Sequence, residues 1–136
     1  MLQPKNAKFP KQQRGRLRGK ASSGQFLEFG VWGLQARESG HLTAKQIESA
    51  RRVIVRRTRR VGKLWIRVFP DKPITARVAE SRMGSGKGAV DHWAAVVKKN
   101  DVLFELTDVG FDLALEAFRA AAFKFGISTK IIYRSL

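Results

Sequence analysis

Residues 43–71, TAKQIESARRVIVRRTRRVGKLWIRVFPD, decide the fold that we expect for this chain. Thr43 followed three residues later by Gln46 fits a capping box, in which each side chain satisfies a backbone donor at a helix start. Side chains suited to a core then recur at helical spacing. This stripe consists of Ile47, Ala50, Ile54, Thr58 and Val61. Gly62 predicts the end of the helix.

The opposite face of the predicted helix is basic, because its residues lie half a turn from the stripe. This face carries Lys45, Arg52, Arg56, Arg59 and Arg60. Only Glu48 interrupts the positive charge, and like charges four residues apart cost an isolated helix roughly 0.2–0.5 kcal/mol per pair. A solvated face is the simpler interpretation, but solvated faces usually mix charges of both signs. We therefore favour a polyanion docked on this face.

The next segment, residues 63–69, alternates as a strand does. One side would carry Leu64, Ile66 and Val68, and the other Trp65, Arg67 and Phe69. The sequence Pro-Asp-Lys-Pro at 70–73 then breaks the pattern. A helix followed at once by a strand, each with an apolar face, predicts a layered α+β domain.

Composition narrows the classes of protein. The 136 residues suggest a single domain covering 1–136, with a basic arm at 1–23 and a globular part at 24–136 that includes a loop at 80–89. There is no cysteine and there are two histidines, so disulfides, thiol catalysis and cysteine- or histidine-rich metal sites are excluded. No serine–histidine or paired-carboxylate constellation stands out. We therefore expect no catalytic residues, metal or cofactor.

The net charge of +16 and the pI near 11.3 point to a nucleic-acid partner. No apolar run approaches the roughly 18 residues of a membrane helix, and the N-terminus lacks the apolar segment of a signal peptide. We interpret the chain as a mature protein with no membrane contact, made in a bacterial cytosol or in an organelle that synthesises the protein itself.

Further elements follow from alternation and turn signals. We expect strands at 25–36, 74–79, 90–98, 102–106 and 128–133, and a polar turn at 37–42. His41 should be an ordinary surface residue, His92 a half-buried one, and Asn100-Asp101 a hairpin turn. A second helix should begin at Asp108 or Asp112 and end at Gly126. Its apolar stripe would be Leu115, Phe118, Ala122 and Phe125.

The arm has seven basic residues and no acidic one. They are Lys5, Lys8, Lys11, Arg14, Arg16, Arg18 and Lys20. With few apolar residues, the arm cannot bury a core of its own. It is either a solubilising tail or an extended arm that orders on a phosphate backbone, and the absence of acids favours the arm. We expect it to be disordered in the free protein.

The segment at 80–88, ESRMGSGKG, has three glycines in five residues and two cations, Arg82 and Lys87. It fails the Walker pattern, because Gly88 follows Lys87 where a serine or threonine is needed. A plain hairpin tip is possible. We favour a mobile basic loop whose glycines let the backbone approach RNA closely.

Three stretches together resemble the bacterial-type family of large-subunit ribosomal protein sixteen. They are MLQPK with RGRLRGK, LTAKQIESARR with GKLWIRVFPDKPIT, and RMGSGKG. The resemblance covers essentially the full length. It implies two helices packed on one side of a mostly antiparallel sheet, a structural role without enzymatic activity, and a location on the ribosome of a bacterium, mitochondrion or plastid. A free nucleic-acid chaperone and an RNA-acting enzyme are the alternatives.

The resemblance also implies partners: large-subunit rRNA at the foot of the central protuberance, tRNA at the aminoacyl site and neighbouring ribosomal proteins, without homo-oligomers. Beside the basic residues of the arm, the rRNA-binding set is Lys45, Arg51, Arg52, Arg56, Arg59, Arg60 and Lys63. The tRNA-binding set is Arg82, Met83, Gly84, Ser85, Gly86, Lys87 and Gly88.

Overall fold

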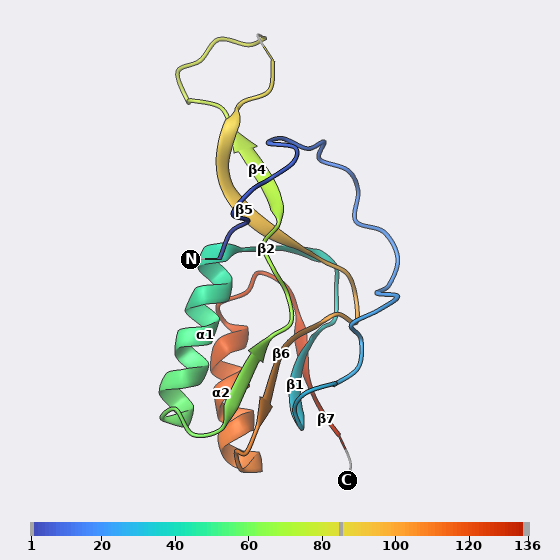
Figure 1. The fold of residues 1–136 in the computed structure, drawn as a ribbon, viewed down its shortest axis with the longest axis vertical. Helices are drawn as coiled ribbons and strands as arrows, with labels where there is room; N and C mark the ends of the chain where they lie inside the picture. The colour runs from blue at the N-terminus through green and yellow to red at the C-terminus, as the bar shows by residue number, and fades with distance from the viewer. Residues whose placement is uncertain (1, 85, 135–136) are drawn as a thin grey trace.

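Two helices lie together on one face of a four-stranded sheet in the computed structural model, which describes residues 2–84 and 86–134 (Figure 1). The helices are α1 (Ala44–Thr58) and α2 (Phe111–Ala122). The strands are β1 (Trp32–Ala36), β2 (Gly40–Thr43), β3 (Lys63–Ile66), β4 (Lys72–Ala76), β5 (Ala89–Val97), β6 (Val102–Thr107) and β7 (Thr129–Tyr133). The expected α+β class with antiparallel pairing is confirmed.

The strands form two sheets rather than one. The order is β3-β6-β1-β7 in the larger sheet and β2-β5-β4 in the smaller, and every strand pair is antiparallel. β4 and β5 extend from the body as a two-stranded ribbon with the glycine-rich loop at its tip (Figure 1). The hairpin expected at Asn100 is wrong. Asn100 does turn the chain, with a φ of 79°, but β5 and β6 belong to different sheets.

This turn is bonded to β1 and not to a hairpin partner. The backbone N–H of Asn100 donates to Ala36 O (2.9 Å), and Gln35 Nε2 donates to Asn100 O (2.9 Å). The N–H of Ala36 in turn donates to Asp101 O (2.8 Å). The base of the ribbon is therefore fixed to the larger sheet.

Helix α1 begins as predicted and ends earlier. Gln46 N donates to Thr43 Oγ1 (3.1 Å) and Thr43 N donates to Gln46 Oε1 (2.9 Å), which confirms the capping box. The helix stops at Thr58, because Arg59 adopts a left-handed conformation with a φ of 54°. Val61 is consequently exposed and not part of the buried stripe. Gly62 lies in the following turn, where a Cβ would meet Thr107 O at 2.2 Å.

Helix α2 is shorter than predicted and has a different cap. Its N-cap is Gly110, and no side chain caps it. The helix begins at Phe111, so the expected start at Asp108 is wrong, whereas the expected start at Asp112 is one residue late and Asp112 lies in the first turn. The buried stripe is Ala114, Ala117, Phe118 and Ala121, whereas Leu115 and Ala122 are only partly buried. The alanines let the helix approach its neighbours closely. Phe125 is buried beyond the helix end and stacks on Phe104 of β6, with ring centroids 6.0 Å apart.

Several other boundaries differ from the sequence prediction. The strand expected at 63–69 ends at Ile66, and the strand expected at 25–36 is confined to Trp32–Ala36. Part of the predicted turn at 37–42 is strand β2, on which His41 is exposed as expected. Across the described residues, no helix is both long and apolar enough to cross a membrane.

Residues 24–30, which we call the strap, cover the face of the larger sheet opposite the helices. Leu34 pairs with Phe104 on the helix side, so the neighbouring pair Gly33 and Glu105 points to the other side. A Cβ at Gly33 would lie 2.3 Å from Leu27 Cδ2. The strap thus packs directly on β1, in irregular conformation.

A buried carboxylate binds the strap to the sheet. Glu105 has no exposed surface, and its Oε1 accepts N–H bonds from Glu28 (2.9 Å), Phe29 (3.0 Å) and Gly30 (3.1 Å). Its Oε2 lies 2.5 Å from Nη1 of Arg67. Burial raises the pKa of Glu105, but Arg67 and the three amides lower it further, so the net pKa lies below its usual value. The carboxylate is therefore held in its charged form.

Candidate nucleic-acid interface

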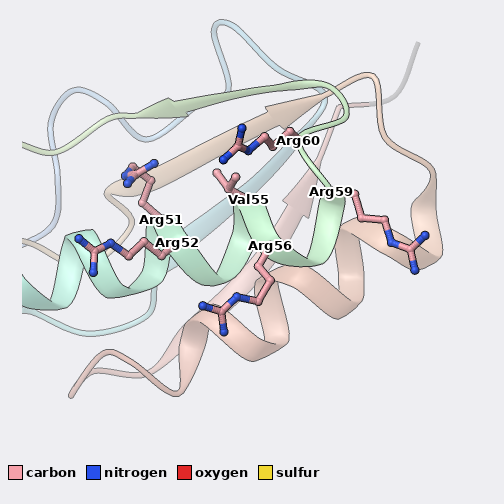
Figure 2. Close-up of a pocket in the computed structure, with 6 residues that line it drawn as sticks. All are labelled: Arg51, Arg52, Val55, Arg56, Arg59 and Arg60. Carbon is pink, nitrogen blue, oxygen red and sulfur yellow. The ribbon is translucent and has the colours of Figure 1, made fainter.

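The basic face of α1 surrounds a shallow hollow of about 460 Å³ (Figure 2). Helical spacing aligns Arg52 and Arg56, and the left-handed conformations of Arg59 and Arg60 turn the chain back beside them. In Figure 2, Arg51 and Arg60 point into the space over Val55, whereas Arg59 extends away. The hollow is lined by Arg51, Arg52, Val55, Arg56, Arg59 and Arg60. Lys45 and Lys63 were also predicted to bind. Both are exposed, and they precede and follow the lining residues in the sequence.

The arginines of this face are not equivalent. Glu48 is the single acid of α1, and it accepts two bonds from Arg51 (Nη2, 2.5 Å; Nε, 3.0 Å) and one from Arg52 (Nε, 3.1 Å). Arg56, Arg59 and Arg60 have no acidic partner within the described residues. These three carry the unneutralised charge that a polyanion would meet.

The arginine cluster lowers the pKa of Glu48 to about 2. The hydrogen bond from Arg51 is the largest cause, burial opposes it, and Arg52 adds to it. Because this pKa lies below the ordinary 4.5, the cluster stabilises the fold above that pH. The stabilisation is lost as the pH falls through about 2.

We expect Arg51→Ala to raise the pKa of Glu48 towards 4.5, since it removes the largest cause of the shift. Arg52→Ala is the matched control, and its effect should be smaller because Arg52 donates one bond and Arg51 donates two. A carboxyl NMR titration of Glu48 in the full chain measures both values. Equal pKa shifts of Glu48 in the two variants would contradict the conclusion that Arg51 contributes more than Arg52.

Arg57 was missed by sequence reasoning, and it has a structural contact. Its Nη1 lies 2.6 Å from Oε1 of Glu116, so it connects α1 to α2. Both side chains are about half exposed, at 50% and 56%. An exposed pair of this kind contributes at most about 1 kcal/mol. The two residues are 59 positions apart, and nothing in the local sequence indicated that they would meet.

The arm runs in extended form beside the ribbon (Figure 1). Lys72 Nζ donates to Arg14 O (2.5 Å), and Lys87 Nζ donates to Gln12 O (2.5 Å). In return, Lys11 Nζ donates to Lys87 O (3.2 Å). The remaining predicted binders of the arm are exposed: Lys5, Lys8, Arg14, Arg16, Arg18 and Lys20. The arm and the loop thus form one basic surface.

The loop at 80–89 occupies the tip of the ribbon, far from the end of α1, near which the hollow lies (Figure 1). Met83 is 98% exposed, and Arg82 and Lys87 are exposed as well. Gly84 and Gly86 have φ values of 96° and 90°, and Gly88 packs where a Cβ would meet Ala76 O at 2.7 Å. Ser85 lies outside the described residues. The structure therefore divides the predicted binding residues between two separate surfaces.

Within residues 2–84 and 86–134, no three or more histidines and acids gather in a group that could hold a metal ion. His92 is partly buried, as predicted, and its Nδ1 lies 2.7 Å from Oδ2 of Asp91. Both candidate surfaces are instead built from cations and exposed backbone, the groups that proteins use to contact phosphates.

Comparison with known proteins identifies close relatives. A family model described as ribosomal protein L16p/L10e matches residues 4–132. The large ribosomal subunit protein uL16 of Trichodesmium erythraeum (strain IMS101) is 57% identical over 134 residues, 98% of each chain. The uL16c proteins of Porphyra purpurea and Thalassiosira pseudonana are 56% and 55% identical. These alignments cover 99% and 98% of this chain and 97% and 98% of the relatives.

Proposed function

Because this chain belongs to the ribosomal protein L16p/L10e family, we propose that α1 binds large-subunit rRNA and that the loop contacts tRNA at the aminoacyl site. The protein is a structural component of the large ribosomal subunit and not an enzyme. Its place is the ribosome, in a bacterial cytoplasm or a plastid. Neighbouring ribosomal proteins are further partners, and we propose that the chain makes no homo-oligomer.

The unpaired arginines around the hollow on α1 carry the rRNA proposal. Guanidinium groups without an acidic partner lose no internal ion pair when they bind a phosphate. They also release the counterions condensed on the RNA, which contributes most of the affinity at low salt. Double-stranded RNA is recognised by its shape and backbone, so a row of cations suits it better than a base-reading pocket does.

The loop has the properties of a reversible contact. It projects from the body on the ribbon, so a second RNA can reach it while α1 is docked. Its cations would meet tRNA phosphates, which are shared by every tRNA and carry no sequence information. In the free chain, Lys87 donates to the arm, and this bond would be exchanged for one to a phosphate.

We expect Arg82→Ala with Lys87→Ala to leave the protein in large subunits at normal occupancy and to weaken aminoacyl-tRNA binding. Each charged hydrogen bond that these two cations make to tRNA would account for a loss of about tenfold. Occupancy is measured by mass spectrometry of gradient-purified subunits, and affinity by binding to the aminoacyl site.

Arg119→Ala with Lys124→Ala removes the same charge from the region of α2 and serves as the control. It should change neither quantity. If the loop variant lowered occupancy while the assembled ribosomes bound tRNA normally, the loop would serve rRNA packing and not tRNA.

A further inference from the structure

Arg77 lies at the neck of the loop, where β4 ends at Ala76. Ala76 pairs with Ala89 of β5, and Gly88 packs against the Ala76 carbonyl, so the neck is tightly closed. The side chain of Arg77 is exposed and starts inside the segment that the neck encloses. None of the binding sets expected from the sequence includes this residue.

The Arg77 guanidinium is bonded to three carbonyl groups of the loop. Its Nη1 donates to Arg82 O (3.3 Å), and its Nη2 donates to Gly86 O (2.8 Å) and to Gly84 O. A guanidinium offers five donors in a planar fork, which allows one side chain to hold several acceptors in a fixed arrangement. Three residues of the proposed tRNA-binding set, Arg82, Gly84 and Gly86, are thus bonded through their carbonyls to one cation.

Other internal support for the loop is sparse among the described residues. One backbone hydrogen bond, from Ser81 N to Val78 O (3.0 Å), closes a turn in its first half. Cβ atoms added at Gly84 and Gly86 would meet nothing within 4 Å, so packing does not hold these residues. The second half of the loop therefore depends on Arg77 and on the bonds between Lys87 and the arm.

This arrangement has an electrostatic consequence. Carbonyl oxygens carry partial negative charge and repel a phosphate, whereas backbone N–H groups and cations attract it. Arg77 places a positive charge against three of these carbonyls, which offsets their partial negative charge. The side chains of Arg82 and Lys87 remain exposed and can meet a polyanion.

We propose that Arg77 is the positioning residue of the loop, holding Arg82, Gly84 and Gly86 in the arrangement that receives tRNA phosphates. The inference rests on the proposed contact between the loop and tRNA. Arg77 itself would touch the loop and not the tRNA. Its contribution would be preorganisation, which improves affinity by reducing the ordering that binding requires.

A spin label tests the positioning directly. The chain has no cysteine, so Met83→Cys gives one labelling site at a residue that is 98% exposed. In the full-length protein, adding Arg77→Ala should narrow the spectrum to that of a freely moving label. Arg77→Lys should give an intermediate spectrum, because one ammonium cannot span the carbonyls that two guanidinium nitrogens hold. An unchanged spectrum with Arg77→Ala would overturn the proposal.

Unlabelled ribosomes test the consequence for tRNA. We expect Arg77→Ala to reduce aminoacyl-tRNA affinity several-fold, Arg77→Lys to recover part of it, and the control Arg119→Ala to have no effect. If Arg82→Ala with Lys87→Ala weakened binding and Arg77→Ala did not, the positioning role would be wrong and the tRNA contact would stand. If neither weakened binding, the proposed function of the loop would fail, and the tRNA role of Arg77 with it.

Discussion

Glu105→Ala should lower the free energy of unfolding by about 3–5 kcal/mol, the cost of breaking a buried ion pair by removing one partner. Two penalties combine in this variant. Arg67, whose side chain is 14% exposed, would lose its partner at 2.5 Å. The N–H groups of Glu28, Phe29 and Gly30 would lose their acceptor. The Gly30 bond is buried, and leaving a buried group unpaired costs about 1–3 kcal/mol.

Glu28→Ala is the matched control. Glu28 also faces Arg67, at 3.7 Å, but its side chain is 60% exposed. An exposed pair contributes at most about 1 kcal/mol, so the control should unfold almost as the parent does. Guanidinium denaturation of the full chain, followed by tryptophan fluorescence, measures both. Comparable losses in the two variants would show that Glu105 does not have the special role we assign to it.

The lowered pKa of Glu105 also predicts how the stability of the protein changes with pH. A carboxyl whose pKa is lowered on folding stabilises the protein above its ordinary pKa, and the stabilisation is lost as the pH falls through the lowered value. Glu105→Gln should remove this acid-side dependence as well as part of the stability. A double change, Glu105→Met with Arg67→Met, should not restore stability, because the three strap amides would still lack an acceptor.

Arg52→Glu with Arg56→Glu should leave the fold intact and weaken binding to a large-subunit rRNA transcript by about 100-fold. Each lost charged hydrogen bond contributes roughly 1.5 kcal/mol, or about tenfold. Arg52 is counted beside the unpaired Arg56 because only its Nε donates to Glu48, which leaves its other donors for a phosphate. Both side chains are exposed on the face opposite the buried stripe, so the core should not change. The slope of log K against log salt should also flatten by roughly 0.7–0.9 per lost contact.

Arg119→Glu with Lys124→Glu makes the same change in net charge in the region of α2. If affinity followed net charge alone, this control would weaken binding as much as the α1 variant. We expect it to weaken binding far less, because a docked face depends on where its charges lie. Circular dichroism of both variants checks that the fold is kept.

The sequence predicted those features that depend on neighbours in the chain. The capping box of Thr43 and Gln46, the buried stripe from Ile47 to Thr58 and the basic face all follow from helical periodicity within a few turns. The α+β class followed from the same local patterns. The position where α1 ends did not, because Arg59 leaves the helix to let the chain return into β3, a tertiary requirement that propensity does not include.

The missed features depend on residues that are distant in the sequence. Alternation predicted a long strand over 25–36, but the N–H groups at 28–30 are bonded to Glu105, more than seventy positions away. The turn at Asn100 resembled a hairpin because local signals do not say which sheet the next strand joins. Arg77 and Arg57 were passed over because an arginine alone does not indicate whether it will bind a partner or hold its own chain.

The ribbon is anchored to the body at one end and carries the loop at the other, so a small rotation at its base moves the loop. Residues 94–97 of β5 pair with β2, so only residues 89–93 project with β4, about 16 Å at roughly 3.3 Å per residue. A tilt of about 5° at the base of this segment would move its tip by about 1.4 Å, enough to disturb a hydrogen bond. The pairing of β5 with β2 and the bonds of Asn100 and Asp101 to β1 hold that angle. The position of the loop relative to a bound tRNA thus depends on how rigidly the base of the ribbon is held, as well as on the contacts within the loop.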